Sequence, residues 1–186
     1  MITTQSHKFI FETNLPRSYT VCSMAHLHSD VRYRSSLVSI TDIRCRPSTG
    51  RLSAEEQATT PELVLPRAGV FVKHVRDRQV VANANHVLFF NANEVYRVSH
   101  PAGGGDDCTS LVFDHSVIAE AKDMYDRVVC ADPQRPYQLG QGLLSLQTIA
   151  CQQRLRQRLN DSSGCALEFE ELALELLHHV LRDVDA

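Results

Sequence analysis

The residues best suited to metal chemistry in this chain gather around a glycine-rich stretch. His100 precedes the run of three glycines at 103–105, and Asp106 and Cys108 follow it. With Cys45 from an earlier stretch they offer an imidazole, two thiolates and a carboxylate, a donor set that suits zinc. A structural turn explains the same residues, with His100 capping it and Asp106 bonding to backbone amides. Both interpretations stay open: a metal site on Cys45, His100 and Cys108, or a structural turn.

A reversible disulfide between Cys45 and Cys108 is a redox alternative at the same place. The chain has six cysteines in all and no C-x-x-C pair. Because it is long and apolar enough to fold without disulfides, and its N-terminus does not resemble a secretory signal, we expect reduced thiols.

An HxH pair at His26 and His28 has the spacing of the metal ligands in metal-binding cupin barrels. Those barrels carry a glutamate a few residues after the pair, and here SDVRYRSS follows instead. Strand alternation alone places the two histidines on one face. We therefore expect an exposed strand face here instead of a metal centre.

A pocket for a small organic effector is the other candidate site. Alternation along VYRVSH places Tyr96, Val98 and His100 on one face of a strand, and His74 in GVFVKHV is a fourth candidate. Together they would set a few polar groups on an apolar wall, the usual composition of a small-ligand site. Simple filling of the barrel interior explains the same residues equally well.

Catalysis has little support in the sequence. It contains no Gly-x-Ser-x-Gly motif and no phosphate-binding loop, and its three consecutive glycines do not open a helix after a strand. We expect those glycines to form a hairpin turn. Arg67 and Arg97 are able to clamp a carboxylate, but a solvated face suits them better. The chain is therefore expected not to be an enzyme; the alternative from another class is a metal-dependent cupin enzyme.

Strands are expected over most of the first 113 residues. Short runs rich in Val, Phe, Tyr and Thr alternate with clusters of Asn, Asp, Gly and Pro. Within 65–113 the predicted strands are GVFVKHV, QVVA, HVLFF, VYRVSH and CTSLVF, and SLVSITDIRCR (36–46), FIFET (9–13) and YTVCSM (19–24) are further strands. Residues 47–61 are expected to form a loop with one helical turn capped by Ser53 and Glu56. This spacing predicts a small barrel or sandwich.

Helices are expected after residue 113, at 116–129, 139–160 and 166–184. Asp114 or Ser116 would cap the first. The apolar stripe of the second would contain Leu143, Leu146, Ile149 and Ala150. The last two helices form an antiparallel hairpin, and Leu172, Leu176 and Val180 on the last helix are the candidate dimer interface.

The overall charge argues against DNA binding by this chain alone. Its net charge is −3 and it has no basic stripe. The sequence also lacks an apolar run long enough to span a membrane. We expect a cytoplasmic protein without a membrane partner.

Four segments resemble the N-terminal regulatory domain of AraC-type bacterial transcription regulators. They are LPRAGVF (65–71), VLFFNANEVYRVSHP (87–101), GGDDCTSL (104–111) and, before them, ITDIRCR (40–46). The resemblance rests on three patterns: an FFN turn, a YR-x-SHP strand and a Gly-Asp-x-Cys-Thr turn.

This resemblance implies a mainly β protein with C-terminal helices. A cupin-like jelly-roll barrel (1–113) would sense an effector, and a helical segment (114–186) packed on it would form a homodimer. The family's helix-turn-helix domain has no counterpart here, so DNA contact would come only through a domain missing from this chain. Neither a cofactor nor an effector is identified; zinc and a small organic molecule are the two candidates.

Overall fold

The computed structural model describes residues 27–47, 50–125, 132–161 and 164–185, which form two antiparallel sheets and three helices. The six-stranded sheet has the order β1 (Leu27–Arg34), β2 (Val38–Cys45), β9 (Asp106–Phe113), β4 (Glu62–Gly69), β7 (His86–Phe90) and β10 (Gln141–Leu143). The four-stranded sheet has the order β3 (Glu56–Gln57), β8 (Val95–Ser99), β5 (Phe71–Val75) and β6 (Arg78–Ala82).

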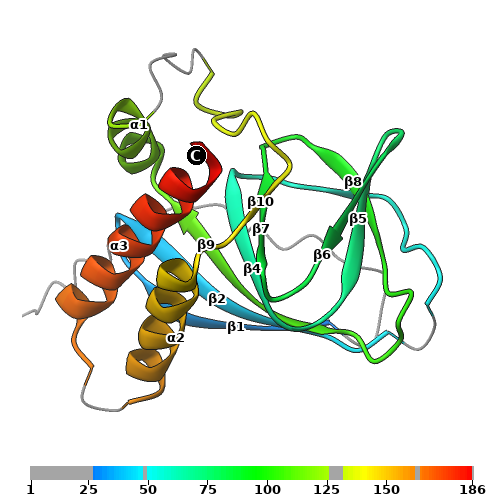
Figure 1. The fold of residues 1–186 in the computed structure, drawn as a ribbon, viewed down its shortest axis with the longest axis horizontal. Helices are drawn as coiled ribbons and strands as arrows, with labels where there is room; N and C mark the ends of the chain where they lie inside the picture. The colour runs from blue at the N-terminus through cyan, green and yellow to red at the C-terminus, as the bar shows by residue number, and fades with distance from the viewer. Residues whose placement is uncertain (1–26, 48–49, 126–131, 162–163, 186) are drawn as a thin grey trace, which may run out of the picture.

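The helices are α1 (His115–Asp123), α2 (Leu146–Asn160) and α3 (Ala166–Asp185). Figure 1 shows α2 and α3 side by side against the six-stranded sheet, with β5, β6 and β8 at the opposite end of the molecule. Arg154 pairs with Glu175, and Arg158, one turn later on α2, pairs with the earlier Glu168 on α3, so the two helices run antiparallel. The expected fold class, a jelly-roll barrel followed by a helical hairpin, is confirmed.

The six-stranded sheet separates two apolar cores because its side chains alternate between its faces. One face joins the helices in a core that includes Ile40, Leu111, Leu155 and Leu177. The other face meets the smaller sheet in a core that includes Val64, Phe71, Leu88, Phe90 and Cys108. The barrel interior and the helix interface therefore lie on opposite sides of the same strands.

The residues predicted to form a dimer interface are instead buried in the chain's own core. Leu172, Leu176 and Val180 are 9%, 1% and 0% exposed and belong to the core between α3 and the sheet. The apolar stripe of α3 is thus occupied by the chain's own barrel. A second copy would have to contact some other surface.

The second predicted helix begins too early. Residues 141–143 form β10 instead, which pairs with the edge of β7, and α2 starts after its N-cap Ser145. The expected stripe is also wrong, because Leu143 and Leu146 are exposed, whereas the buried residues of α2 are Thr148, Cys151, Gln152 and Leu155. The segment after residue 113 therefore contributes a strand to the barrel sheet as well as helices.

One smaller expectation also changes, and another is confirmed. No helical turn follows Ser53: its hydroxyl accepts a hydrogen bond from the Val98 amide at 2.9 Å, and Glu56 begins strand β3. Asp114 does cap α1, accepting from the Ser116 amide at 2.9 Å.

The strands predicted at 9–13 and 19–24, and His26, lie outside the described residues, while His28 is exposed on β1. Among the helices described, none is both long and apolar enough to cross a membrane.

Candidate functional site

The glycine-rich turn crosses from one sheet to the other. β8 lies in the four-stranded sheet and β9 in the six-stranded sheet, so the predicted hairpin is wrong: the two strands do not pair. Gly105 has φ +76°, and a Cβ atom there would lie 1.9 Å from the carbonyl oxygen of Cys45. Only glycine permits this approach. The turn therefore brings the end of β8 and the start of β9 onto the end of β2.

Three ligand-type side chains meet at this junction. The sulfur of Cys45, a ring nitrogen of His100 and a carboxylate oxygen of Asp106 all lie within 4.8 Å of one another. The three residues are 9%, 4% and 6% exposed. His100 Nε2 lies 2.5 Å from Asp106 Oδ1, which fits an N–H donating to the carboxylate. These three side chains, from the end of β2, the residue after β8 and the start of β9, form a group that could hold a metal ion.

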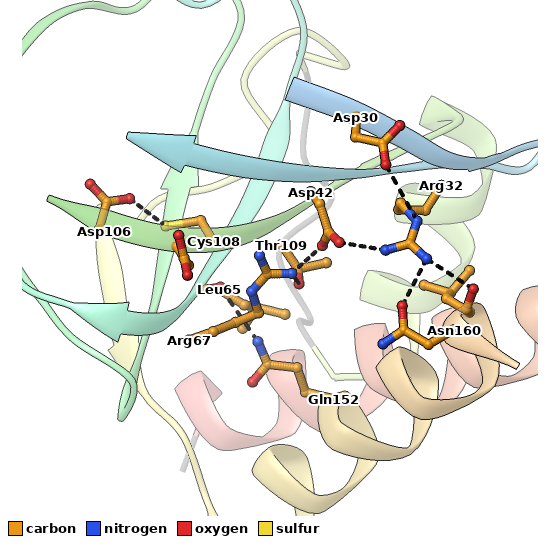
Figure 2. Close-up of polar contacts among 12 residues, drawn as sticks. Asp30, Arg32, Asp42, Leu65, Arg67, Asp106, Cys108, Thr109, Gln152 and Asn160 are labelled. Carbon is orange, nitrogen blue, oxygen red and sulfur yellow. Dashed lines mark hydrogen bonds and ion pairs between the residues drawn. The ribbon is translucent and has the colours of Figure 1, made fainter. Parts of the chain in front are cut away.

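Cys108 takes a different place from the predicted one. Its thiol donates to Asp106 Oδ2 at 3.0 Å (Figure 2), whereas His100 lies against the other carboxylate oxygen, Oδ1. Burial, and then the neighbouring Asp106, raise the pKa of Cys108 well above its usual value. Of the predicted Cys45, His100 and Cys108, the first two therefore come together with Asp106, whereas Cys108 lies behind the carboxylate.

The strand register also disfavours a Cys45–Cys108 disulfide, and neither residue is in a disulfide in the structure. Cys45 pairs with Asp106, and Cys108 pairs with Ile43, so the two cysteines are diagonal neighbours. Diagonal positions are about 7–8 Å apart, whereas a disulfide needs Cβ atoms about 3.5–4.5 Å apart.

Arg46 fastens the two backbones that carry the cluster. Its Nη1 donates to the carbonyl oxygens of Cys45 and Asp106, at 2.9 Å each, and its Nη2 pairs with Asp107 at 2.6 Å. The ends of β2 and β9 are thus joined by a charged side chain as well as by the ladder. Arg46 therefore stabilises the backbone that positions Cys45 and Asp106.

The predicted effector residues do not form one set. Tyr96 and Val98 face the core between the sheets, where the Tyr96 ring packs edge-on against Phe90 at 4.9 Å. His74 is on the opposite face of β5, and its Nε2 lies 2.8 Å from the Ser99 hydroxyl. His74 is therefore removed from the pocket, whereas Tyr96, Val98 and His100 keep the common face that alternation predicted.

Lys73 is the interior residue that sequence reasoning missed. It pairs in register with Val98 and is 1% exposed. Its ammonium donates to the Phe89 carbonyl at 2.8 Å, forms an ion pair with Glu94, and lies 3.6 Å from the centroid of the Phe90 ring. Burial lowers its pKa, and the contact with Glu94 opposes that shift. The sequence contained a signal for this position, since alternation places Lys73 on the same strand face as the apolar Phe71.

A second, partly buried carboxyl interacts with Lys73 from the larger sheet. Glu62 accepts a hydrogen bond from Ser110, and its charge is felt by Lys73. Burial raises the pKa of Glu62, an effect that the Ser110 hydroxyl and the lysine charge reduce. The barrel interior therefore holds two polar groupings, one around Lys73 and one around His100.

On the outer face of the same strands a charged network reaches the helices. Asp42, which pairs in register with Thr109, accepts from Arg67 and from Arg32, the latter at 2.7 Å. Arg32 continues to the Asn160 side chain, at 2.8 Å, at the end of α2 (Figure 2). Arg67 is buried in this network, so its predicted solvated face is wrong.

Two further places have the ingredients of a site. Cys151, Glu175 and His179 bring ligand-type atoms within 4.8 Å between α2 and α3, but Glu175 is already paired with Arg154. A hollow outside the barrel, between α1, α3 and residues 136–139, is lined by Tyr125, Tyr137 and Leu181. Neither place contains a site residue that was predicted from the sequence.

Comparison with known proteins gives structural likeness only. No protein-family model matches the chain, and no curated protein matches it. A solved cupin superfamily protein from Desulfitobacterium hafniense is similar over 54% of this chain and 94% of its own, with 19% identity and a TM-score of 0.40. A cupin domain from Bordetella pertussis is similar over 48% and 94%, with 13% identity and a TM-score of 0.38. A Rhizobium leguminosarum protein of unknown function is similar over 50% and 86%, with 15% identity and a TM-score of 0.43.

Proposed function

We propose that this chain is the sensing and dimerisation part of an AraC-type transcription regulator, and that it controls a DNA-binding domain outside this chain. The observation that carries the proposal is where the motif residues lie. His100 from YR-x-SHP, and Asp106 and Cys108 from Gly-Asp-x-Cys-Thr, meet in one buried, hydrogen-bonded cluster. The segments that carry the resemblance thus converge on one interior site.

The chemistry of the interior favours sensing over catalysis in this proposal. Lys73 is held by Glu94 and the Phe89 carbonyl, so its ammonium is already committed to structural contacts. A sensor needs an interior whose packing depends on occupancy, and an effector acts by binding one of two conformations more tightly. The buried polar groups between the two sheets make the packing depend on occupancy, because a bound effector would change which hydrogen-bond partners they have.

The position of the helices supports transmission from barrel to partner. α2 and α3 pack on the outer face of the sheet whose inner face holds the cluster. Dimerisation stays part of the proposal, with the contact placed away from the buried face of α3. Leu143 and Leu146, at 67% and 84% exposed, are the apolar side chains we choose to test.

A dimer-dependent reporter tests the proposal. The whole chain is fused to a DNA-binding domain that represses its operator only as a dimer. Repression is expected, and Leu143→Asp with Leu146→Asp should relieve it without changing the far-UV circular dichroism of the purified chain. A folded chain that sediments as a monomer and gives no repression contradicts the dimerisation function.

A further inference from the structure

We propose that Cys45, His100 and Asp106 bind one zinc-class divalent cation and leave a fourth coordination position open. This inference deepens the proposed function, on which its regulatory meaning rests, by naming what the barrel senses. The binding itself stands on the geometry of the cluster and is tested separately.

The spacing of the three donor atoms suits a tetrahedral ion. Zinc lies about 2.3 Å from thiolate sulfur and about 2.0–2.2 Å from nitrogen or oxygen, so its ligand atoms lie roughly 3.3–3.8 Å apart. The three atoms here are already within 4.8 Å of one another. They come from the end of β2, the residue after β8 and the start of β9. Binding needs side-chain movement alone: the His100 and Asp106 atoms, now 2.5 Å apart, must separate slightly to reach this spacing, and the strand pairing does not change.

Charge balance makes the buried position suitable for a dication. One thiolate and one carboxylate neutralise a 2+ ion, so the occupied site carries no net charge, which lowers the cost of burying it. On binding, the Cys45 thiol loses its proton to solvent. His100 gives up its hydrogen bond to Asp106 and keeps a ring proton on Nδ1, so that Nε2 becomes a ligand.

The donor types select the class of ion. A thiolate with an imidazole favours zinc or cobalt and disfavours magnesium and calcium, which prefer oxygen ligands. Three protein ligands with an open position are the arrangement of zinc sites that also accept an exogenous ligand. A small molecule with a donor atom is therefore able to complete the site.

Cys108 acts as a positioning residue. Its thiol donates to Asp106 Oδ2 at 3.0 Å, so that Oδ1, on the side of His100, is the oxygen that would bind the ion. Removing a hydrogen bond of this kind typically weakens metal affinity by about 10–100-fold. Cys108→Ala should show that loss, whereas Cys108→Ser keeps a donor and should recover most of the affinity.

Cobalt titration of the tag-free, chelator-treated chain tests the proposal. We expect one Co²⁺ per chain, with a thiolate-to-cobalt absorption band in the near ultraviolet, and displacement by Zn²⁺. Cys45→Ser should abolish the band, and His100→Ala and Asp106→Asn should weaken binding beyond the 10–100-fold expected of Cys108→Ala. His179→Ala is the matched control from the Cys151–Glu175–His179 cluster and should bind as the parent does.

Two results of the titration overturn the proposal: no saturable Co²⁺ binding, or binding lost in His179→Ala but kept in His100→Ala. X-ray absorption of the cobalt-loaded parent chain needs no variant and should show one sulfur with nitrogen and oxygen neighbours; a sulfur-free shell also overturns it. Metal binding without reporter repression would refute the regulator function alone. Repression by a chain that binds no Co²⁺ would refute the metal site alone.

Discussion

Replacing Lys73 by methionine should destabilise the protein far more than removing a surface charge. Lys73 is buried between the sheets, where its ammonium contacts Glu94, the Phe89 carbonyl and the Phe90 ring. Methionine keeps the length of the stem but removes the charge. The Glu94 side chain, 13% exposed, is then left without its counter-ion.

The size of the effect follows from the burial of the pair. Removing one partner of a buried ion pair costs about 3–5 kcal/mol, and losing the ring contact adds at most about 2 kcal/mol. A swap between side chains of similar volume changes packing by less than about 1.5 kcal/mol. We expect Lys73→Met to lower the free energy of unfolding by about 3–5 kcal/mol. In a chain of this size that corresponds to a drop in Tm of roughly 6–20 °C.

Urea unfolding followed by circular dichroism at pH 7 measures the loss. Arg97→Met is the matched control, because Arg97 pairs with Glu55 at 3.7 Å with the side chains 47% and 63% exposed. Such surface pairs contribute about 0–1 kcal/mol. Adding Glu94→Gln to Lys73→Met should recover about 1–3 kcal/mol, since no unpaired charge then stays buried. If Lys73→Met costs no more than Arg97→Met, the buried ion pair is refuted.

Three further changes test other parts of the structure. The pKa of Glu62 is raised by burial above 4.5, so its protonated form favours folding below that pH and the benefit is lost as pH rises through the folded pKa. The stability of the parent relative to Glu62→Gln should therefore fall between pH 4 and pH 8 in urea titrations; a constant difference would contradict this. Gly105→Ala should destabilise the chain more than Gly104→Ala in the same assay: both glycines have positive φ, which costs about 1–3 kcal/mol, but only at Gly105 would the new Cβ meet Cys45. Leu176→Asp should abolish the cooperative thermal transition, because the residue is in the core; a folded variant with altered sedimentation would instead restore it as a dimer contact.

Local pattern was enough to predict most strands of the barrel. Strand-forming residues bounded by turn residues located β5, β7 and β8 closely. β10 was missed because its residues stand in a leucine-rich run that is typical of a helix. What makes them a strand is pairing with β7, some 50 residues earlier, and no local pattern contains that information.

The candidate site was predicted in part for the same reason. Alternation correctly separated His74 from Lys73 but does not say which face of β5 points inward; that depends on the pairing of Lys73 with Val98. Cys45 and His100 were recognised as ligand types. Whether Asp106 or Cys108 completes the set depends on rotamers that the sequence does not specify.

The two faces of β2 and β9 explain how a site inside the barrel is connected to the helices. Cys45 and Asp106 pair at one end of these strands, and Asp42 and Thr109 pair three residues along, with side chains on the opposite face. Odd spacing along a strand reverses the face, so the ladder that positions the ligands also positions the acceptor of Arg32 and Arg67. In the regulator that we propose, a signal from the cluster to the Arg32 contacts with α2 would follow these paired strands.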